Sequence, residues 1–140
     1  MAKLFILPIK PEHIINLWPQ VLPYLERAVK YDTPNPDYTI EHMQRWLVSG
    51  RWELLIGVDE LGETHGIATL SYIDYPLHKI AFITCISGRM VTTKSSWDAL
   101  VDYATEQGAT KIQAHCRPSM LRLGRRLGFE HITSLMEIVI

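Results

Sequence analysis

Three strand-like runs of residues follow one another in the middle of the chain with only short turns between them. The runs cover residues 52–58, 65–73 and 79–86, and the turns lie at 59–63 and 74–76. Strands joined by so few residues must pair antiparallel, because a parallel pair needs a crossover of about a dozen residues or more. The centre of the chain therefore predicts an antiparallel sheet that begins with a hairpin.

After this sheet the sequence alternates between helix and strand patterns. A helix is predicted from Ser95 to about residue 107, followed by a strand over 111–116, and this helical crossover predicts a parallel neighbour. A helix over 117–128 and a closing strand over 132–140 complete the pattern. The mixture of antiparallel and parallel pairing predicts an α+β fold with a mixed sheet.

The N-terminal part of the chain contributes one more strand, over residues 4–9. Apolar residues at helical spacing then predict helical structure from Pro11 to about Lys30. Pro19 and Pro23 each remove a backbone hydrogen bond, so we expect them to split this stretch into two short helices.

A loop over residues 31–38 leads into a second helix over 39–48, with Thr39 as its N-cap. The full order is then β-α-α-β-β-β-α-β-α-β. We expect it to form a single domain over residues 1–140.

The composition limits the classes of protein to which the chain can belong. Hydrophobic residues are 47% and charged residues 21% of the 140, which excludes a disordered chain. A net charge of −1 argues against a nucleic-acid partner, and no apolar run is long enough to span a membrane. Two cysteines and no signal-peptide core favour a reducing, cytoplasmic setting. No spacing of His and Cys indicates a metal site.

The element order and the stretches Gly108–Ile112 and Arg122–Glu130, with Leu127-Gly128-Phe129-Glu130 at the end, resemble the GNAT superfamily of N-acyltransferases. The resemblance implies transfer of an acyl group from acetyl-CoA or another acyl-CoA to an amine. It also implies that the cofactor lies in a wedge between the strands predicted at 79–86 and 111–116, with its pyrophosphate on backbone N–H groups at a helix N-terminus.

The segment that corresponds to the superfamily's cofactor loop lacks its usual glycines and has only one, at its start. Backbone groups at the beginning of the segment are expected to hold the cofactor. Hydroxyls, amides and a lysine further along the segment are expected to bind its phosphates. The alternative is an ordinary polar loop before a helix. The cofactor-binding candidates are Ile86, Ser87, Gly88, Arg89, Met90, Thr92, Thr93, Lys94 and Ser95.

The residues that the resemblance would make catalytic are absent. Gly124 stands where many members have a Tyr acid, Arg117 where they have an Asn, and Phe82 and Ile83 where a Glu base often lies. The amine must still lose a proton for acyl transfer. The sequence therefore assigns no catalytic residue.

Three other residues near the expected wedge remain open to interpretation. His115 has a side chain suited to acid–base catalysis, but it also fits the polar face of a half-buried strand. Cys85 and Cys116 are interpreted as buried small hydrophobic residues. Cys116 adjoins His115, but successive strand residues point to opposite faces, so the two are not a catalytic dyad.

Two features of the C-terminal part suggest a protein partner. Arginines between residues 117 and 126 form an arginine face, which is either solvated, a phosphate contact or a docking patch. The apolar strand predicted at 132–140 would leave an exposed sheet edge, which favours a homo-oligomer or a larger protein assembly. The arginines are Arg117, Arg122, Arg125 and Arg126.

A narrower resemblance is to GNAT-like proteins of tailed bacteriophages. It rests on residues 18–23, on residues 66–69 with Tyr75-Pro76 downstream, and on Ser87-Gly88 ahead of a helix. This resemblance implies an alternative function, in which a non-catalytic domain serves as a virion or host-interaction protein in the host cytoplasm or the virion.

Overall fold

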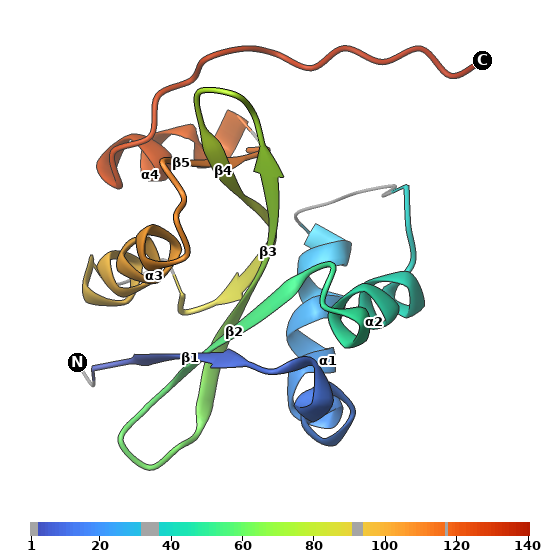
Figure 1. The fold of residues 1–140 in the computed structure, drawn as a ribbon, viewed down its shortest axis with the longest axis vertical. Coiled ribbons are helices and arrows are strands. Elements are labelled where there is room, and N and C mark those ends of the chain that lie inside the picture. Colours follow the sequence, from blue (N-terminus) through green and yellow to red (C-terminus); the bar gives the residue numbers. More distant parts are fainter. Residues whose placement is uncertain (1–2, 32–36, 91–93, 117) are drawn as a thin grey trace.

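A five-stranded sheet organises the fold (Figure 1), in a computed structural model that describes residues 3–31, 37–90, 94–116 and 118–140. The strands lie side by side in chain order; the first four are antiparallel, and the fifth is parallel to the fourth. The prediction of a mixed sheet with a central hairpin is confirmed. The strands are β1 (Phe5–Ile9), β2 (Glu53–Val58), β3 (Thr64–Asp74), β4 (Lys79–Gly88) and β5 (Lys111–Ala114).

Helices cover both faces of this sheet. The helices α1 (Ile14–Tyr31) and α2 (Ile40–Ser49) pack on one face, and α3 (Lys94–Glu106) packs on the other (Figure 1). The short helix α4 (Leu121–Arg126) follows β5. None of the described helices is long and apolar enough to cross a membrane.

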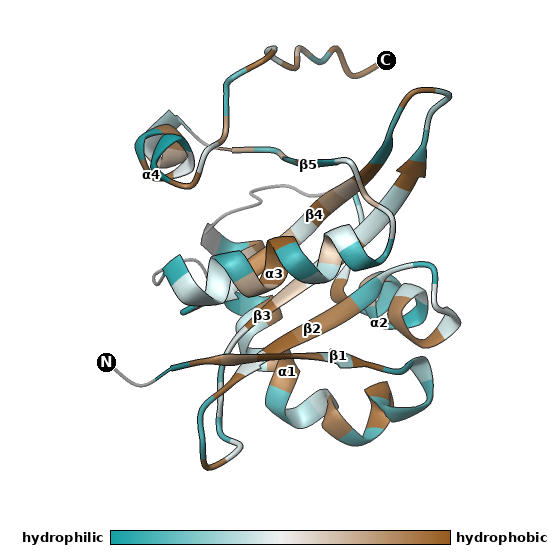
Figure 2. Ribbon diagram, turned by 60° about the vertical axis from the view of Figure 1, so that its left-hand side comes forward, coloured by the Kyte–Doolittle hydropathy of each residue, from teal (hydrophilic) through white to brown (hydrophobic). Residues whose placement is uncertain are grey.

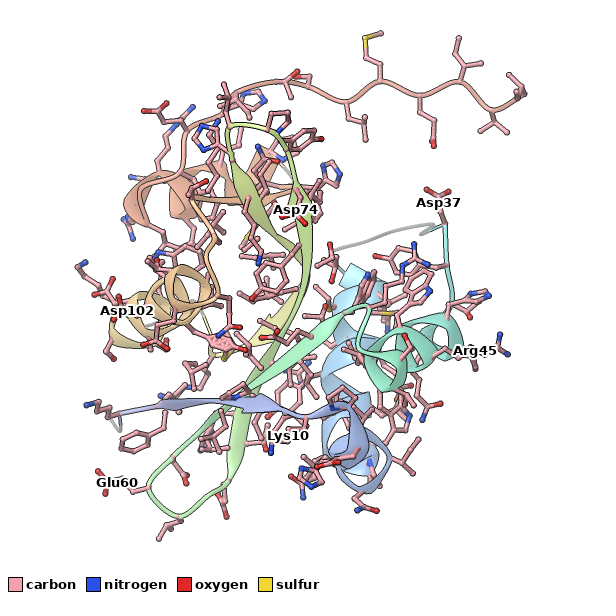
Figure 3. The ribbon with its side chains drawn as sticks, in the orientation of Figure 1. Lys10, Asp37, Arg45, Glu60, Asp74 and Asp102 are labelled. Carbon is pink, nitrogen blue, oxygen red and sulfur yellow. The ribbon has the colours of Figure 1, made fainter. Side chains whose placement is uncertain are left out.

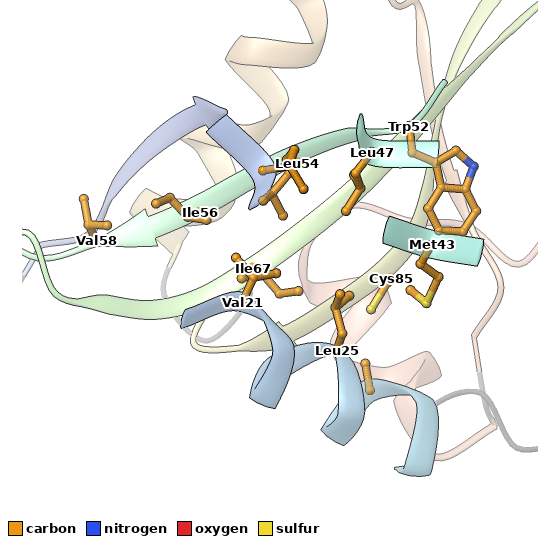
Figure 4. Packing of buried hydrophobic residues seen from close by; sticks show 12 residues of the cluster. Val21, Leu25, Met43, Leu47, Trp52, Leu54, Ile56, Val58, Ile67 and Cys85 are labelled. Atoms are coloured by element: carbon orange, nitrogen blue, oxygen red, sulfur yellow. The ribbon is translucent and has the colours of Figure 1, made fainter. Parts of the chain in front are cut away.

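The face under α1 and α2 carries the larger of two apolar clusters (Figure 4). Val21 and Leu25 of α1 and Leu47 of α2 pack in one cluster with Leu54 and Ile56 of β2 (Figure 4). Thr39 caps α2 as predicted, since its side chain accepts a hydrogen bond from the backbone N–H of His42, while His42 Nδ1 accepts one from Thr39 N at 2.9 Å. This reciprocal capping satisfies two backbone donors at the start of α2.

The face under α3 carries the second cluster. Trp97 and Leu100 of α3 pack on Leu55 of β2 and on Ala68 and Leu70 of β3. Leu54 and Leu55 thus point to opposite faces, as successive strand residues must. The central strands are therefore buried from both sides.

The expected split of the first helix at its prolines is wrong, because α1 is continuous through Pro19 and Pro23. Each proline costs about 3 kcal/mol in a helix interior. One continuous helix also places Val21 and Leu25 at 1% and 0% exposure, and burying such side chains gains about 1.5–3 kcal/mol each. Packing against the sheet offsets the loss of the proline hydrogen bonds.

The predicted strand over 132–140 is also wrong. Residues 129–140 form no helix or strand, and every side chain of 130–140 is exposed. Figure 2 shows this segment, which we call the C-terminal tail (130–140), leaving the body of the protein. A strand pattern alone does not make a strand, because the backbone groups of a strand need a neighbouring strand as partner. The predicted helix over 117–128 is shortened to α4, preceded by a single turn over Pro118–Met120.

Candidate functional site

The strands β4 and β5 pair over only four residues. The pairing begins at Ile80 with Lys111 and ends at Ile83 with Ala114, while β4 continues to Gly88. Among the described residues, the last five of β4 therefore have a neighbouring strand on the β3 side only. We call this segment, Thr84–Gly88, the open edge; it lies where the resemblance places the cofactor wedge.

A β-bulge begins where the pairing with β5 stops. Leu70 of β3 faces Ile83 and Thr69 faces Cys85, so Thr84 is an extra residue in β4. The Thr84 hydroxyl lies 2.7 Å from the Thr69 hydroxyl and donates to the Thr69 carbonyl at 3.1 Å. These contacts hold the bulge against β3.

The backbone of the open edge presents hydrogen-bonding groups away from β3. The N–H of Arg89 donates to the carbonyl of His65 at 2.8 Å, so the backbone N–H of Arg89 points toward β3. Successive residues of an antiparallel strand direct their N–H and C=O groups to alternate sides. Gly88 has a positive φ of 74°, so this alternation holds only for the extended residues before it, where it directs the N–H and C=O of Ile86 toward the side that β5 has left.

A row of glycines at the end of β4 leaves room for the side chain of Met90. Gly57, Gly66 and Gly88 are opposite one another on β2, β3 and β4. A Cβ atom on Gly57 would lie 2.7 Å from Met90 Sδ, and one on Gly66 would lie 2.8 Å from Met90 Cγ. Met90 is fully buried against this row, so its side chain faces the core at the end of β4 rather than a ligand.

The other predicted cofactor residues differ in their surroundings. Ser87 is buried and Ile86 half-buried, whereas Ser95 and Lys94 are exposed. Lys94 Nζ lies 3.4 Å from Asp98 one turn along α3, an exposed pair that leaves the ammonium in solvent. Thr92 and Thr93 lie outside the described residues.

The segment after β5 contacts the rest of the protein through two ring contacts and through Leu127, which packs on the cluster under α3. Phe129, after α4, lies 5.2 Å from Trp97 of α3, and His115 lies 5.1 Å edge-on from Phe82 of β4, both measured between ring centroids. His115 is exposed and lies one residue beyond β5. It is therefore a protonatable group close to the point where β4 and β5 separate.

The cysteines and arginines lie at separate places. Cys85 is buried as predicted, but Cys116 is exposed, so its interpretation as a buried hydrophobic residue is wrong. The strand that was expected to bury it ends two residues earlier. The arginine face of α4 is exposed at Arg122, Arg125 and Arg126, and Arg117 lies outside the described residues.

Sequence analysis missed a group of titratable side chains under α3, made of Glu53, Tyr72 and Tyr103. Burial raises the pKa of Tyr72 to about 12, and the nearby Glu53 carboxylate adds to this shift. Burial also raises the pKa of Tyr103, and the Glu53 carboxylate adds to this shift. Tyr72 faces Ala81, seven residues before Gly88, so the group lies away from the open edge. A shallow surface groove between β1 and α3 lies beside it and is bordered by Tyr103 and Asp102. Figure 3 labels Asp102 on α3.

Comparison with solved structures identifies the fold. A ribosomal-protein-alanine N-acetyltransferase from Brucella melitensis superposes with a TM-score of 0.71 at 15% identity, covering 98% of this chain and 99% of that one. AAC(6')-Iy in complex with the bisubstrate analogue CoA-S-monomethyl-acetylneamine gives 0.71 at 15% identity over 99% of both chains. A predicted acetyltransferase from Clostridium acetobutylicum with acetyl-CoA gives 0.66 at 16% identity, over 97% and 96%.

These likenesses establish the fold, which is that of GNAT acetyltransferases, and they extend over nearly the whole chain. No protein-family model matches the sequence, and no curated protein matches it significantly. The narrower likeness to bacteriophage proteins stays a prediction from the sequence.

Proposed function

We propose that the protein binds acyl-CoA along the open edge of β4 and transfers the acyl group to an amine. The observation that carries this proposal is the separation of β4 from β5 at the Thr84 bulge. Unpaired backbone groups of an edge strand form hydrogen bonds with an extended partner that carries amides. The pantetheine arm of CoA is such a partner, and Ile86 would pair with it.

The phosphates of CoA would lie beyond the open edge, toward the start of α3. The N-terminus of a helix favours anions, because its first N–H groups lack partners within the helix. Lys94 is exposed at this end and adds a positive charge. Met90 and the hydrogen bond from the buried Ser96 hydroxyl to the Met90 carbonyl at 2.9 Å fix the two flanks of the connection.

A residue of this chain would accept the proton that the acceptor amine loses. When bound, acyl-CoA supplies an activated thioester, so that the amine forms a bond to the acyl carbon and the CoA thiol leaves. His115 is the exposed imidazole near the end of β5, and we assign it the role of accepting the proton that the amine loses. Phe82 holds the ring from one side.

A second candidate function is binding without acyl transfer. It is favoured by the apolar side chains Phe82 and Ile83 and by Gly124, which stand where the resemblance would place an acid or a base. The protein would then use the same fold as an interaction domain.

Calorimetric titration with acetyl-CoA and with free CoA tests the proposal. We expect a Kd in the micromolar range, several-fold weaker in Lys94→Ala and unchanged in the matched control Lys10→Ala, another exposed lysine outside the site. The absence of heat and of a thermal shift at millimolar ligand would overturn acyl-CoA binding.

Turnover separates the two candidate functions. We expect His115→Gln to slow acetylation of a panel of primary amines at least tenfold while it leaves the Kd for CoA unchanged. Binding of CoA with no acetylation of any amine by the unmodified protein would favour the interaction domain.

A further inference from the structure

Three side chains that bind metals in many proteins come together at one end of β3, two from the turn after β2 and one from β3 itself. Asp59, Glu63 and His65 each offer one ligand atom, and these atoms all lie within 4.8 Å of one another. We propose that they form a binding site for a divalent transition-metal ion of the zinc type. This site is independent of the proposed acyl transfer.

The turn holds Asp59 in position for this role. One carboxylate oxygen, Oδ1, accepts hydrogen bonds from the backbone N–H groups of Leu61 at 2.8 Å and Glu63 at 3.0 Å. The other oxygen, Oδ2, lies 2.7 Å from Nε2 of His65. The backbone therefore orients the carboxylate, and its second oxygen faces the imidazole; metal-binding carboxylates are oriented by hydrogen bonds in the same way.

The set of donor atoms favours a transition metal. Zinc binds imidazole nitrogen and carboxylate oxygen at about 2.0–2.2 Å, and catalytic zinc sites often have three protein ligands and one water. Calcium and magnesium favour sites made of oxygen atoms alone. A small movement that separates Asp59 Oδ2 from His65 Nε2 would place an ion between them, with the Glu63 carboxylate as third ligand.

The accessibility of the cluster fits an exchangeable ion. The side chains of His65 and Asp59 are 28% and 15% exposed, and Glu63 is exposed. The half-buried pair gives the site two ligands with restricted movement. The exposed glutamate leaves a path by which the ion can enter from solvent.

The position of the site connects it to the end of β4. The carbonyl of His65 accepts the hydrogen bond from Arg89 N–H, and the next residue, Gly66, faces Gly88. The hydroxyl of Tyr24 also donates to the Thr64 carbonyl at 2.9 Å, which ties the same stretch of β3 to α1. An ion on His65 would thus steady the backbone that holds the end of β4.

Calorimetric titration with zinc chloride at pH 7 tests the proposal. A Cys116→Ser background removes the exposed thiol, which would otherwise compete for zinc. We expect one dominant site. His65→Gln removes the nitrogen ligand and should weaken binding at least tenfold, since the loss of a group that merely orients a ligand commonly has an effect of about that size.

A matched control is His13→Gln, which removes an exposed histidine that lies 3.8 Å from a single carboxylate, that of Glu12. We expect it to leave zinc affinity unchanged. Equal weakening by both substitutions, or no heat at millimolar zinc, would overturn the proposal.

A measurement on the Cys116→Ser protein with its histidines intact keeps the test independent of the folding of the His65 variant. Nickel ions are paramagnetic and broaden the amide NMR signals of nearby residues. We expect broadening centred on residues 59–65. Broadening centred on His115 or His131 instead would contradict the assignment.

Discussion

Packing differs sharply between the two sides of residue 110. Residues 3–110 contain every fully buried side chain that the structure describes, whereas residues 111–140 contain none. The first region folds around two apolar clusters, and the second is held by the short strand β5 and by ring contacts to Trp97 and Phe82. The open edge lies at the boundary, so one side of the proposed site is rigid and the other is loosely held.

The largest expected effect is loss of a side chain from the well-packed region. Leu55 is fully buried in β2, and Leu→Ala at such a position costs about 2–5 kcal/mol. We expect this loss in the free energy of unfolding of Leu55→Ala, measured in urea. The matched control is Leu135→Ala in the C-terminal tail, where the side chain is 79% exposed and we expect a change within about 0.5 kcal/mol. Similar costs at both positions would show that the tail is covered.

A smaller effect is expected at the contact that joins the two regions. Phe129→Ala removes the ring that packs on Trp97, and we expect a loss of about 1–2 kcal/mol. Hydrogen exchange should rise in residues 111–130 and stay unchanged in β2 and β3. The exposed Phe5→Ala serves as control. Equal deprotection throughout the chain would mean that the regions unfold as one unit.

The raised pKa of Tyr72 under α3 predicts that the stability of the well-packed region depends on pH. Because the folded pKa of Tyr72 is about 12 and the unfolded value is about 10, the neutral form favours the folded state. Its contribution is fully present below pH 10 and is lost as the pH rises through about 12. Tyr72→Phe should reduce this loss of stability at alkaline pH. The measurement is thermal unfolding of both proteins between pH 9 and about 12. The exposed Tyr75→Phe should leave it unchanged; an equal change in both variants would contradict the prediction.

The smallest effect is expected in the tail. Ile138→Ser replaces a side chain that is 86% exposed, and we expect stability to change by less than about 0.5 kcal/mol in dilute solution. Sedimentation at increasing concentration tests whether the tail has a partner. A dimer that weakens in Ile138→Ser would mean that a second copy covers the tail, and we propose this form of self-association for the apolar segment.

Local patterns predicted most of the fold in the well-packed region. The hairpin of β2 and β3 and the capped start of α2 at Thr39 depend on neighbouring residues, so the sequence alone indicates them. The continuous helix through Pro19 depends on packing with residues far along the chain. The missing strand at 132–140 likewise depends on a partner that its own pattern does not specify.

The candidate site was predicted only in part, for the same reason. The segment from Ile86 to Ser95 was identified from its place in the element order. The buried position of Met90 was not, because it depends on glycines that meet only in the register of three strands. The cluster around His65 was missed because its ligands share no regular spacing and meet through a turn.

The extra residue at Thr84 has a consequence for comparing this chain with others. Ile83 packs in the cluster under α3 and Cys85 in the cluster under α1, although two positions apart in a regular strand would share a face. An alignment with a strand that lacks the bulge needs a gap at Thr84. Without this gap, every position from there to Gly88 would be assigned to the opposite face of the sheet, and a substitution meant for one apolar cluster would fall in the other.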